Sequence, residues 1–313
     1  MTDKVELSAV VPIELSGERL DQVAAQLFPD YSRSRLQTWI KKGDLLVDGE
    51  QRRPRDKVFE GMYLNVGTEL EAEVAWQGQD IDLDIVYEDE SILVLNKPAG
   101  LVVHPAAGHA DGTLVNALLN HCPDMARLPR GGIVHRLDKE TSGIMVAAKT
   151  LPAHVHLVNQ LQERTVKREY CAVCVGTMTG GNTVNEPLGR HPKDRKKMAV
   201  RALGGKPAIT HYRLVTRFAN HTRVAVNLET GRTHQIRVHM AYRKYPLIGD
   251  PVYGGRPRIP KGASGQALHA MALGLIHPAS KEQVNFECPL AEDIEVLLDT
   301  LAREDRHTTN ELY

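Results

Sequence analysis

Residues 131–150 read GGIVHRLDKETSGIMVAAKT. Two apolar runs, Ile133–Val134 and Ile144–Ala148, flank a polar segment that contains Arg136 and Asp138. A guanidinium and a carboxylate inside an otherwise apolar stretch are costly to bury unless they are paired or functional. On this segment alone, the favoured interpretation is a buried ion pair that closes a turn. The alternative is a nucleophilic Asp138, because a carboxylate can attack an electrophilic carbon.

A second polar concentration lies at 228–240, where the sequence is LETGRTHQIRVHM. Helical spacing resumes near Ile236, so Arg232, His234 and Arg237 lie where a predicted strand turns into a helix. Helix N-termini with a nearby arginine bind phosphates and carboxylates well. The alternative is ordinary surface polarity.

The segment VKREYCAVCVG at 166–176 predicts a strand that carries Tyr170, a position typical of core or edge packing. Cys171 and Cys174 lie on the same strand and point to opposite faces, so they cannot chelate one ion together. The sequence has no H-E-x-x-H, no P-loop, and no G-x-G-x-x-G after a strand. It therefore predicts neither a metal site nor a cofactor.

The remaining pattern mixes strands and helices without a regular alternation. We predict a strand, turn and strand followed by a loop over 85–105, a helix over 153–164, and a hairpin that pairs 211–218 with 223–228. A tail helix follows, with Ile294, Leu297, Leu298 and Leu301 on one face. The lack of a βαβ rhythm favours an α+β fold with a mixed, largely antiparallel sheet flanked by helices.

The N-terminal region predicts a small separate module. One helix would bury Leu20, Val23, Ala24 and Leu27, and a second would be capped by Ser32, bury Leu36, Trp39 and Ile40, and stop at Gly43. Short strands are expected in LLVDGE (45–50), with Asp48-Gly49 as the turn, and in VFEGMYLNV (58–66).

The second helix of this module carries charge of one sign on its predicted outer face. The outward positions are Arg33, Arg35, Lys41 and Lys42, and Arg52, Arg53 and Arg55 follow. A solvated helix face is the plain interpretation. A basic face with no interleaved acids favours contact with the phosphates of RNA or DNA.

The chain has 313 residues, and its 39 Lys plus Arg balance its 39 Asp plus Glu. At roughly 150 residues per domain, this length predicts two domains. The composition excludes low-complexity disorder, a collagen-like repeat and a disulfide scaffold. A net charge of zero also argues against a nucleic-acid-binding protein, because such proteins usually carry a basic surplus.

Basic and acidic residues balance only when they are counted over the whole chain. Residues 31–57 hold eight basic and four acidic side chains, 190–206 hold seven and one, and 228–261 hold seven and two. By contrast, 60–90 hold ten acidic side chains and no basic one, and 282–305 hold eight acidic and one basic. We therefore expect the fold to gather the three basic blocks around one cleft and to turn the acidic blocks away.

The cellular compartment is also predicted. The first residues, MTDKVELSAVVPIEL, lack the apolar core of a signal peptide, and no apolar run approaches the roughly 20 residues of a membrane span. Four cysteines in so long a chain do not make a disulfide framework. We expect a cytoplasmic protein with reduced thiols that does not contact a membrane.

Taken together, four ordered motifs and the N-terminal module resemble a known family. The motifs are NKPAGLVVHP (96–105), HRLDKETSG around Asp138, KREYCAV (167–173) and TGRTHQIRVH (230–239). They resemble the RNA pseudouridine synthases that modify ribosomal large-subunit RNA, and the N-terminal module resembles an S4-type RNA-binding domain. The resemblance implies a small S4-type α/β domain at 17–76 and an α+β pseudouridine synthase catalytic domain at 77–313.

The resemblance also implies a reaction. The N1–C1′ glycosidic bond of a uridine is broken, the uracil is turned, and it is rejoined through C5, with no cofactor. Asp138 would be the catalytic aspartate, and Arg237 would pair with it and keep it ionised and oriented. Tyr170 would pack on the uracil. Arg136 would contact the RNA backbone or fill the space left by the base, which must flip out of its stack to react.

The implied substrate is 23S ribosomal RNA, free or in large ribosomal subunit particles, at the helix 69 stem-loop. The side chains expected to bind this RNA are Arg136, Arg33, Arg35, Lys41, Lys42, Arg232 and His234. We expect a monomer without a metal. The alternatives are a synthase for tRNA or other ribosomal uridines, and a non-catalytic RNA-binding assembly factor. The residues leave open whether Asp138 attacks ribose C1′, attacks uracil C6, or promotes a glycal route.

Overall fold

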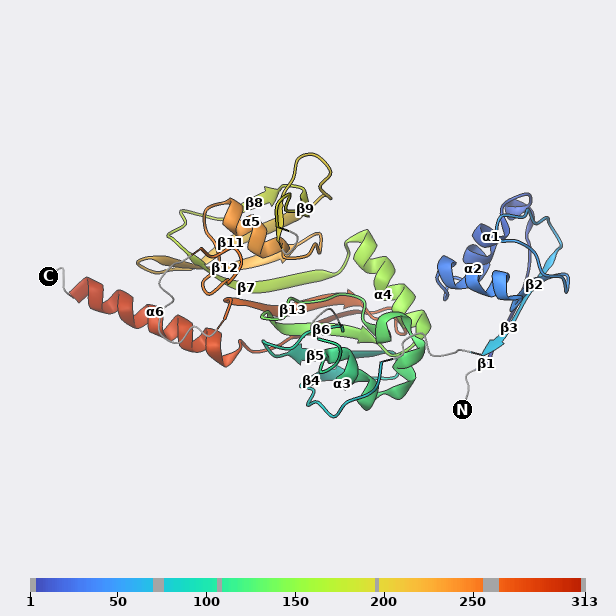
Figure 1. Cartoon of the computed structure of the whole chain (residues 1–313), viewed down its shortest axis with the longest axis horizontal. Helices are drawn as coiled ribbons and strands as arrows, with labels where there is room; N and C mark the ends of the chain where they lie inside the picture. Colours follow the sequence, from blue (N-terminus) through green and yellow to red (C-terminus); the bar gives the residue numbers. More distant parts are fainter. Residues whose placement is uncertain (1–3, 70–75, 106–108, 195–196, 256–264, 311–313) are drawn as a thin grey trace.

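The computed structural model describes residues 4–69, 76–105, 109–194, 197–255 and 265–310. The N-terminal unit lies at one end of the long axis and the C-terminal helix at the other, with a large sheet between them (Figure 1). Part of the predicted acidic segment, 70–75, and parts of two basic blocks, 195–196 and 256–261, lie outside the described residues.

The N-terminal unit contains three strands and two helices: β1 (Lys4–Val10), α1 (Leu20–Leu27), α2 (Arg33–Lys42), β2 (Leu45–Val47) and β3 (Tyr63–Glu69), with a 3₁₀ turn at Ile13–Leu15. The helix predictions are confirmed. The Ser32 hydroxyl accepts from the backbone N–H of Arg35 at the start of α2, and Gly43 ends the helix with φ of 88°.

The N-terminal sheet has the order β1-β3-β2. Asp48 and Gly49 both have positive φ, as the hairpin turn requires, and Val47 and Glu50 exchange backbone hydrogen bonds across it. Two details differ from the prediction. Residues 58–62 are not strand, and β1, which lies before the predicted 17–76 range, pairs with β3 along its whole length.

Most of the rest of the described chain forms one large sheet with helices around it. Its order is β4-β5-β6-β13-β7-β12-β11-β8, with β14 paired to β13. Of these pairs, only β6 with β13 is parallel, so the predicted mixed and largely antiparallel α+β fold is confirmed. The strands are β4 (Ile85–Glu88), β5 (Ile92–Lys97), β6 (Ser142–Ala148), β7 (Lys167–Val175), β8 (Asn182–Asn185), β11 (Ile209–Arg217), β12 (His221–Leu228), β13 (Leu268–Ile276) and β14 (Gln283–Glu287).

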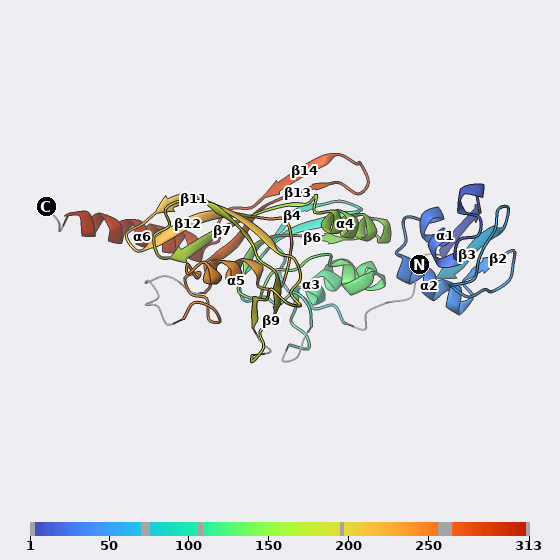
Figure 2. The same cartoon turned by 90° about the horizontal axis from the view of Figure 1, so that it is seen from above.

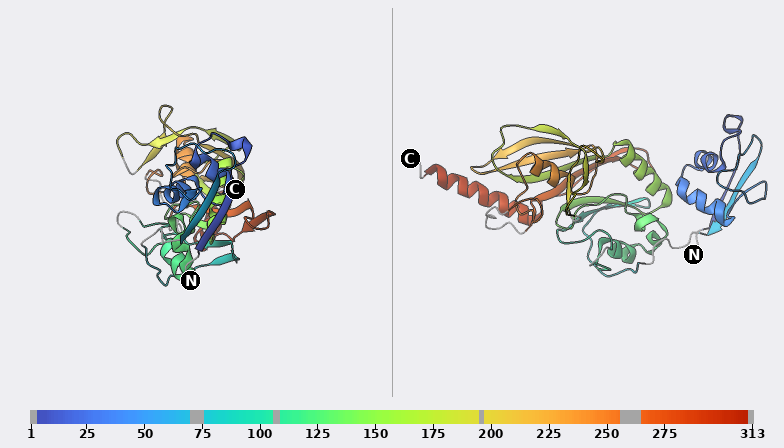
Figure 3. Two further views of the ribbon diagram at one scale, coloured as in Figure 1. Left: turned by 90° about the vertical axis from the view of Figure 1, so that its right-hand side faces the viewer. Right: turned by 45° about the horizontal axis from the view of Figure 1, so that its top comes forward.

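Helices cover the two halves of this sheet differently. Helices α3 (Leu114–His121) and α4 (Leu151–Glu163) pack with β5 and β6 into the main apolar core, near two 3₁₀ turns at Pro123–Arg127 and Pro129–Gly132 (Figure 2). Helix α5 (Gln235–Tyr242) lies in the other half, with β7, β11 and β12 (Figure 3, right). A small hairpin, β9 (Leu188–Arg190) with β10 (Met198–Val200), lies near α5, and α6 (Glu292–Asn310) ends the chain.

The predicted strand with two cysteines is confirmed as β7, where Cys171 and Cys174 are both buried and free. Within the described ranges there is no group of three or more His, Cys, Asp or Glu side chains arranged to hold a metal ion. None of the helices that the structure describes is long and apolar enough to span a bilayer.

Gly143 lies where two strands of the large sheet approach one another closely. It pairs with Ala270 across the parallel junction of β6 and β13, and its φ is 112°. A Cβ at this position would collide with the backbone carbonyl of Ala270. Because β6 directly follows the loop that carries Asp138, this contact also fixes where that loop ends.

We expect Gly143→Ala to lower the free energy of unfolding by about 3 kcal/mol or more, since backbone strain and overpacking each cost roughly 1–3 kcal/mol. Urea denaturation measures the change. The matched control is Gly67→Ala in β3, where a Cβ meets no atom within 4 Å. A Gly143→Ala protein as stable as the control would contradict this account of the junction.

Candidate active site

A cleft of about 810 Å³ opens between the two halves of the large sheet. Its walls carry Asp138, Tyr170 and the 228–237 segment, which the sequence singled out separately. Two carboxylates and six arginines line it; the arginines are Arg130, Arg136, Arg164, Arg168, Arg232 and Arg237. The excess of guanidinium groups favours binding of a polyanion in the cleft.

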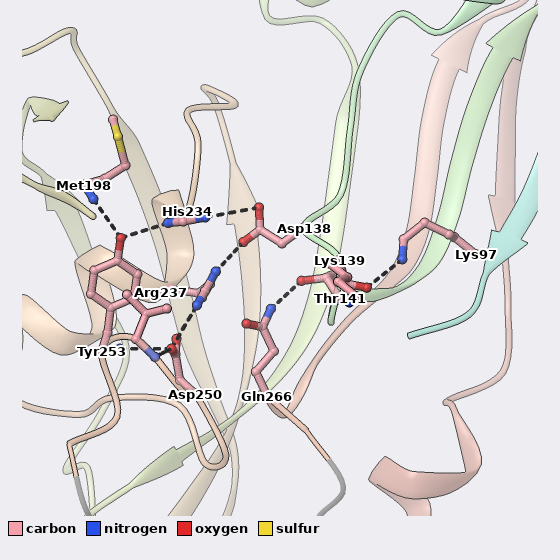
Figure 4. A network of polar contacts seen from close by, with 11 residues as sticks. Lys97, Asp138, Lys139, Thr141, Met198, His234, Arg237, Asp250, Tyr253 and Gln266 are labelled. Atoms are coloured by element: carbon pink, nitrogen blue, oxygen red, sulfur yellow. Dashed lines mark hydrogen bonds and ion pairs between the residues drawn. The ribbon is translucent and has the colours of Figure 1, made fainter. Parts of the chain in front are cut away.

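The loop that bears Asp138 is held by its neighbours on both sides (Figure 4). The Asp138 carbonyl accepts from the Thr141 N–H at 3.1 Å, and the Thr141 hydroxyl accepts from the Gln266 amide at 2.6 Å. The next carbonyl along, that of Lys139, accepts from the Lys97 ammonium at 3.1 Å. The Asp138 side chain is 17% exposed, so a fixed carboxylate presents one edge to the cleft.

Lys97 is fully buried, and its ammonium donates only to backbone carbonyls in the contacts that the structure describes. The acceptors are Pro98 at 2.7 Å, Leu101 at 2.9 Å and Lys139 at 3.1 Å. Burial lowers the pKa of Lys97 to about 8, against the opposing charges of Glu140 and Asp138. This lysine joins the end of β5 to the Asp138 loop.

Arg237 on α5 bridges two carboxylates. It donates from Nε and Nη2 to Asp250 at 2.8 and 2.9 Å, and from Nη1 to Oδ2 of Asp138 at 2.9 Å. Burial opposes its charge, but the hydrogen bonds and charges of the two carboxylates outweigh burial and raise the pKa of Arg237. The expected pairing of Asp138 with Arg237 is therefore present in the structure. Arg136 instead is exposed and lines the cleft, so the turn-closing pair is not formed.

Asp250 is the more deeply buried of the two carboxylates, with no exposed side-chain surface. It also accepts from the backbone N–H groups of Val252 and Tyr253, at 2.8 and 3.0 Å. Burial alone would raise its pKa, but Arg237 and these backbone donors hold the pKa of Asp250 below its usual value. Because Asp250 holds the Arg237 guanidinium through two hydrogen bonds, that group has little freedom to move away from Asp138.

His234 begins α5 in the left-handed conformation, with φ of 57°. Its Nδ1 lies 2.8 Å from the Tyr253 hydroxyl, and its Nε2 lies 3.9 Å from Oδ1 of Asp138. The Tyr253 hydroxyl in turn accepts from the backbone N–H of Met198 at 2.8 Å. Burial, together with the positive charges of Arg237 and Arg136, lowers the pKa of His234 against the opposing effect of Asp138.

The predicted change from strand to helix at 228–240 is confirmed, and Gln235 explains its rigidity. The Gln235 amide oxygen accepts from the Thr230 hydroxyl at 2.8 Å and from the Arg232 N–H at 3.0 Å. Its amide nitrogen donates to the Ile209 carbonyl at 3.0 Å. These bonds tie the TGRTHQ segment to β11.

Tyr170 lies on β7 and lines the cleft, 7% exposed. Burial raises the pKa of its phenol, so the hydroxyl keeps its proton. Arg168 lies two residues earlier on the same face of the strand and also lines the cleft. The tyrosine ring can therefore form one wall for a planar ligand.

The residues predicted to bind RNA divide into two groups. Arg136, Arg232 and His234 line the cleft, whereas Arg33, Arg35, Lys41 and Lys42 belong to α2 in the N-terminal unit. Lys41 and Lys42 are exposed as predicted. Arg33 is half exposed and forms an ion pair of 2.7 Å with the buried Asp21.

The prediction for Arg35 was wrong in one respect. Its side chain is buried rather than outward, and its guanidinium donates to the Arg127 carbonyl at 3.3 Å. Position 35 precedes the buried Leu36, at the edge of the apolar stripe, so the helix turns it toward the neighbouring unit. Arg35 therefore joins α2 to the 3₁₀ turn at Pro123–Arg127.

The expected gathering of three basic blocks around one cleft is borne out only in part, and residues 195–196 and 256–261 of these blocks lie outside the described residues. Of the three, only 228–261 supplies residues to the lining that the structure describes. Arg130, Arg136, Arg164 and Arg168 come from outside all three blocks. Counts along the sequence did not find them, because acidic residues near them in the chain offset their charge.

Sequence reasoning missed several residues of the site. Asp250, Tyr253 and Lys97 received no role in the sequence analysis. The available signal was weak: GDPVYGG places an acid and an aromatic residue in a glycine-rich loop, which is also the composition of an ordinary turn.

Comparison with known proteins is consistent across the chain. A family model described as RNA pseudouridylate synthase matches residues 91–242, and one described as S4 domain matches residues 18–62. Ribosomal large subunit pseudouridine synthase D of Pseudomonas aeruginosa is 58% identical over 317 residues, which cover 98% of each chain. The protein of that name from Escherichia coli strain K12 is 52% identical, over 96% of each chain. Among solved structures, Human RNA Pseudouridylate Synthase Domain Containing 1 superimposes with a TM-score of 0.56 and 25% identity, over 73% of this chain and 96% of the human one.

Proposed function

The chain belongs to the RNA pseudouridylate synthase family, and from that membership we propose that it converts uridines of large-subunit ribosomal RNA to pseudouridine. The protein is an isomerase, and the proposal concerns its substrate and its residues. The relatives with 52–58% identity are named for the large ribosomal subunit. That naming, together with the arginine-lined cleft, supports RNA of this subunit as the substrate.

The proposal makes Asp138 the catalytic carboxylate. The observation that carries it is the Asp138–Arg237–Asp250 bridge at the wall of the cleft, with donor–acceptor distances of 2.8–2.9 Å. Arg237 and the hydrogen-bonded loop fix the Asp138 carboxylate before a substrate arrives. Such preorganisation is what a group that assists cleavage of an N1–C1′ bond requires.

Tyr170 and Arg136 complete the proposed site. The reacting carbon is inaccessible in a stacked helix, so the target nucleotide must flip, at a cost of a few kcal/mol. The wall formed by Tyr170 suits stacking against the extracted uracil. The exposed guanidinium of Arg136 is placed to contact backbone phosphate or to fill the space that the base leaves. Arg232 would hold phosphate at the rim.

The proposed target is the helix 69 stem-loop of 23S RNA. Loop bases are already partly unstacked, so the cost of flipping them is lowest. The test supplies purified protein with 23S RNA, large-subunit particles and tRNA, and maps pseudouridine by site. The proposal expects product in helix 69 of one or both ribosomal substrates. Product in tRNA alone would assign the tRNA alternative, and no product in any RNA would assign an assembly factor.

The N-terminal unit is proposed to be the S4-type RNA-binding domain, divided from the catalytic domain near residue 76. Its own apolar core, around Leu20, Leu36 and Leu64, supports the division. The exposed end of α2, with Lys41 and Lys42, faces away from the apolar stripe and suits phosphate contacts. The proposal also includes a cytoplasmic monomer that needs no metal.

We expect Lys41→Ala with Lys42→Ala to raise KM for the RNA by about tenfold and leave kcat unchanged. Each phosphate contact contributes a slope of about 0.7–0.9 to the dependence of log affinity on log salt concentration, so the slope should fall by about one to two. Steady-state kinetics at four salt concentrations measures both. Arg303→Ala on α6 is the control. A fall in kcat with unchanged KM would contradict a binding role.

A further inference from the structure

The two carboxylate oxygens of Asp138 have unequal partners. Oδ2 accepts from Arg237 at 2.9 Å, whereas the polar group nearest to Oδ1 in the ion pairs of the described residues is Nε2 of His234, at 3.9 Å. That separation exceeds a hydrogen bond by about 1 Å. The imidazole and Oδ1 therefore face one another without direct contact (Figure 4).

Tyr253 determines which nitrogen of His234 carries the proton. The Tyr253 oxygen already accepts from the Met198 N–H at 2.8 Å, so its own hydroxyl proton is available to His234 Nδ1, also at 2.8 Å. A neutral ring that accepts at Nδ1 carries its proton on Nε2. Burial lowers the pKa of His234, which favours this neutral ring. The Nε2–H then points at Asp138.

The backbone conformation of His234 also supports this orientation of its imidazole. A left-handed φ on a residue other than glycine costs roughly 1 kcal/mol or more and persists only where the surroundings hold it. His234 takes this conformation at the start of α5, and its side chain makes no cap bond to the helix. The imidazole is thus directed to Tyr253 and Asp138 in place of the helix end.

We propose that His234 is a positioning residue for Asp138: its Nε2–H donates to Oδ1 when RNA fills the cleft, and Tyr253 holds the ring for that bond. The proposal rests on the proposed function, in which Asp138 is the reacting carboxylate. With Arg237 on Oδ2 and His234 on Oδ1, both oxygens have a fixed donor and the carboxylate cannot rotate. His234 then acts through Asp138. The sequence analysis had instead assigned His234 to RNA binding.

The test measures single-turnover rate and KM for His234→Ala, His234→Gln and Tyr253→Phe. We expect His234→Ala to lower the rate about a hundredfold with KM unchanged, because a misplacement of about 1 Å in a catalytic group costs that much. The amide of His234→Gln can donate to Oδ1, so at least about a tenth of the wild-type rate should return. Tyr253→Phe keeps the ring under Arg237 and loses only the hydroxyl, so a fall of about tenfold is expected.

A double-mutant cycle separates positioning from general damage. If Tyr253 acts through His234, Tyr253→Phe should have no further effect on the rate in a His234→Ala background. Tyr212→Phe, a buried tyrosine of β11 outside the cleft lining, is the matched control and should keep the wild-type rate. Independent, multiplying effects of the two substitutions would overturn the proposal.

Three other outcomes are distinguishable. A raised KM with an unchanged rate in His234→Ala would assign His234 to RNA binding and reject the positioning role. If Asp138→Asn retains turnover, the assignment of Asp138 as the catalytic carboxylate fails, and the role of His234 fails with it. If Asp138→Asn is inactive but His234→Ala keeps the full rate, only the role of His234 fails.

Discussion

Asp138→Asn is expected to lower turnover on the RNA substrate by about 10⁴-fold or more, because loss of a group that attacks or assists in the bond-breaking step removes most of the rate enhancement. Asparagine has the same shape, and its amide oxygen can still accept from Arg237 Nη1, now 2.9 Å from Oδ2. The site should therefore stay folded and bind RNA within about threefold of wild type. Single-turnover assays and RNA titration measure the two quantities separately.

The control for Asp138→Asn is Asp299→Asn, on an exposed position of α6 far from the cleft. It makes the same chemical change and should keep full turnover. Loss of RNA affinity in Asp138→Asn with a normal rate at saturation would show that the carboxylate shapes the binding surface and takes no part in the reaction.

The second large effect is on stability, from Arg237→Met. Methionine leaves Asp250 buried, with backbone N–H groups as its remaining donors and no cation beside it. Breaking a buried pair by removing one partner costs roughly 3–5 kcal/mol. We expect a fall of that size in the free energy of unfolding, and turnover should fall with it because Asp138 loses its fixed donor.

The pH dependence of the same variant has a definite sign. In the wild type the pKa of Asp250 is lowered, so its contribution to stability is present above the unfolded pKa of about 3.9 and is lost as pH falls through the folded pKa. In Arg237→Met, burial without the guanidinium should raise the pKa of Asp250. Stability should then fall as pH rises from about 4. Urea denaturation from pH 4 to 8 measures the slope.

A second substitution separates the stability effect from catalysis. In Arg237→Met with Asp250→Asn, the unpaired buried charge is gone, so part of the lost stability should return and the reversed pH slope should disappear. Turnover should stay low, because Asp138 still lacks Arg237. Equal instability of the single and double variants would contradict the account of Asp250 as an uncompensated charge.

The fold was predictable where local patterns determine it. Helices α1 and α2 followed from apolar spacing with Ser32 and Gly43 as boundaries, and the hairpin of β11 and β12 followed from two alternating runs around a turn. Strand β1 was missed although its polar and apolar residues alternate, and only one of its side chains, Val5, is buried. Its place depends on pairing with β3, more than 50 residues away.

The site was predictable only in part, for a physical reason. Asp138 and Arg237 are 99 residues apart, and no periodicity connects them. Their pairing was expected from the family resemblance alone. Asp250 and Tyr253 contribute through burial and through contacts with Arg237 and His234, which depend on how two halves of a sheet meet. A formal charge of zero likewise concealed a cleft lined by six arginines, because the sum ignores position.

Site-resolved pseudouridine mapping of 23S RNA tests the central claim most directly. The RNA would come from a strain that lacks the gene for this protein and carries either the wild-type chain or Asp138→Asn. The account predicts pseudouridine in the helix 69 loop with the wild-type chain and unmodified uridine there with Asp138→Asn. Equal modification with both chains would contradict the assignment of Asp138 as the catalytic carboxylate.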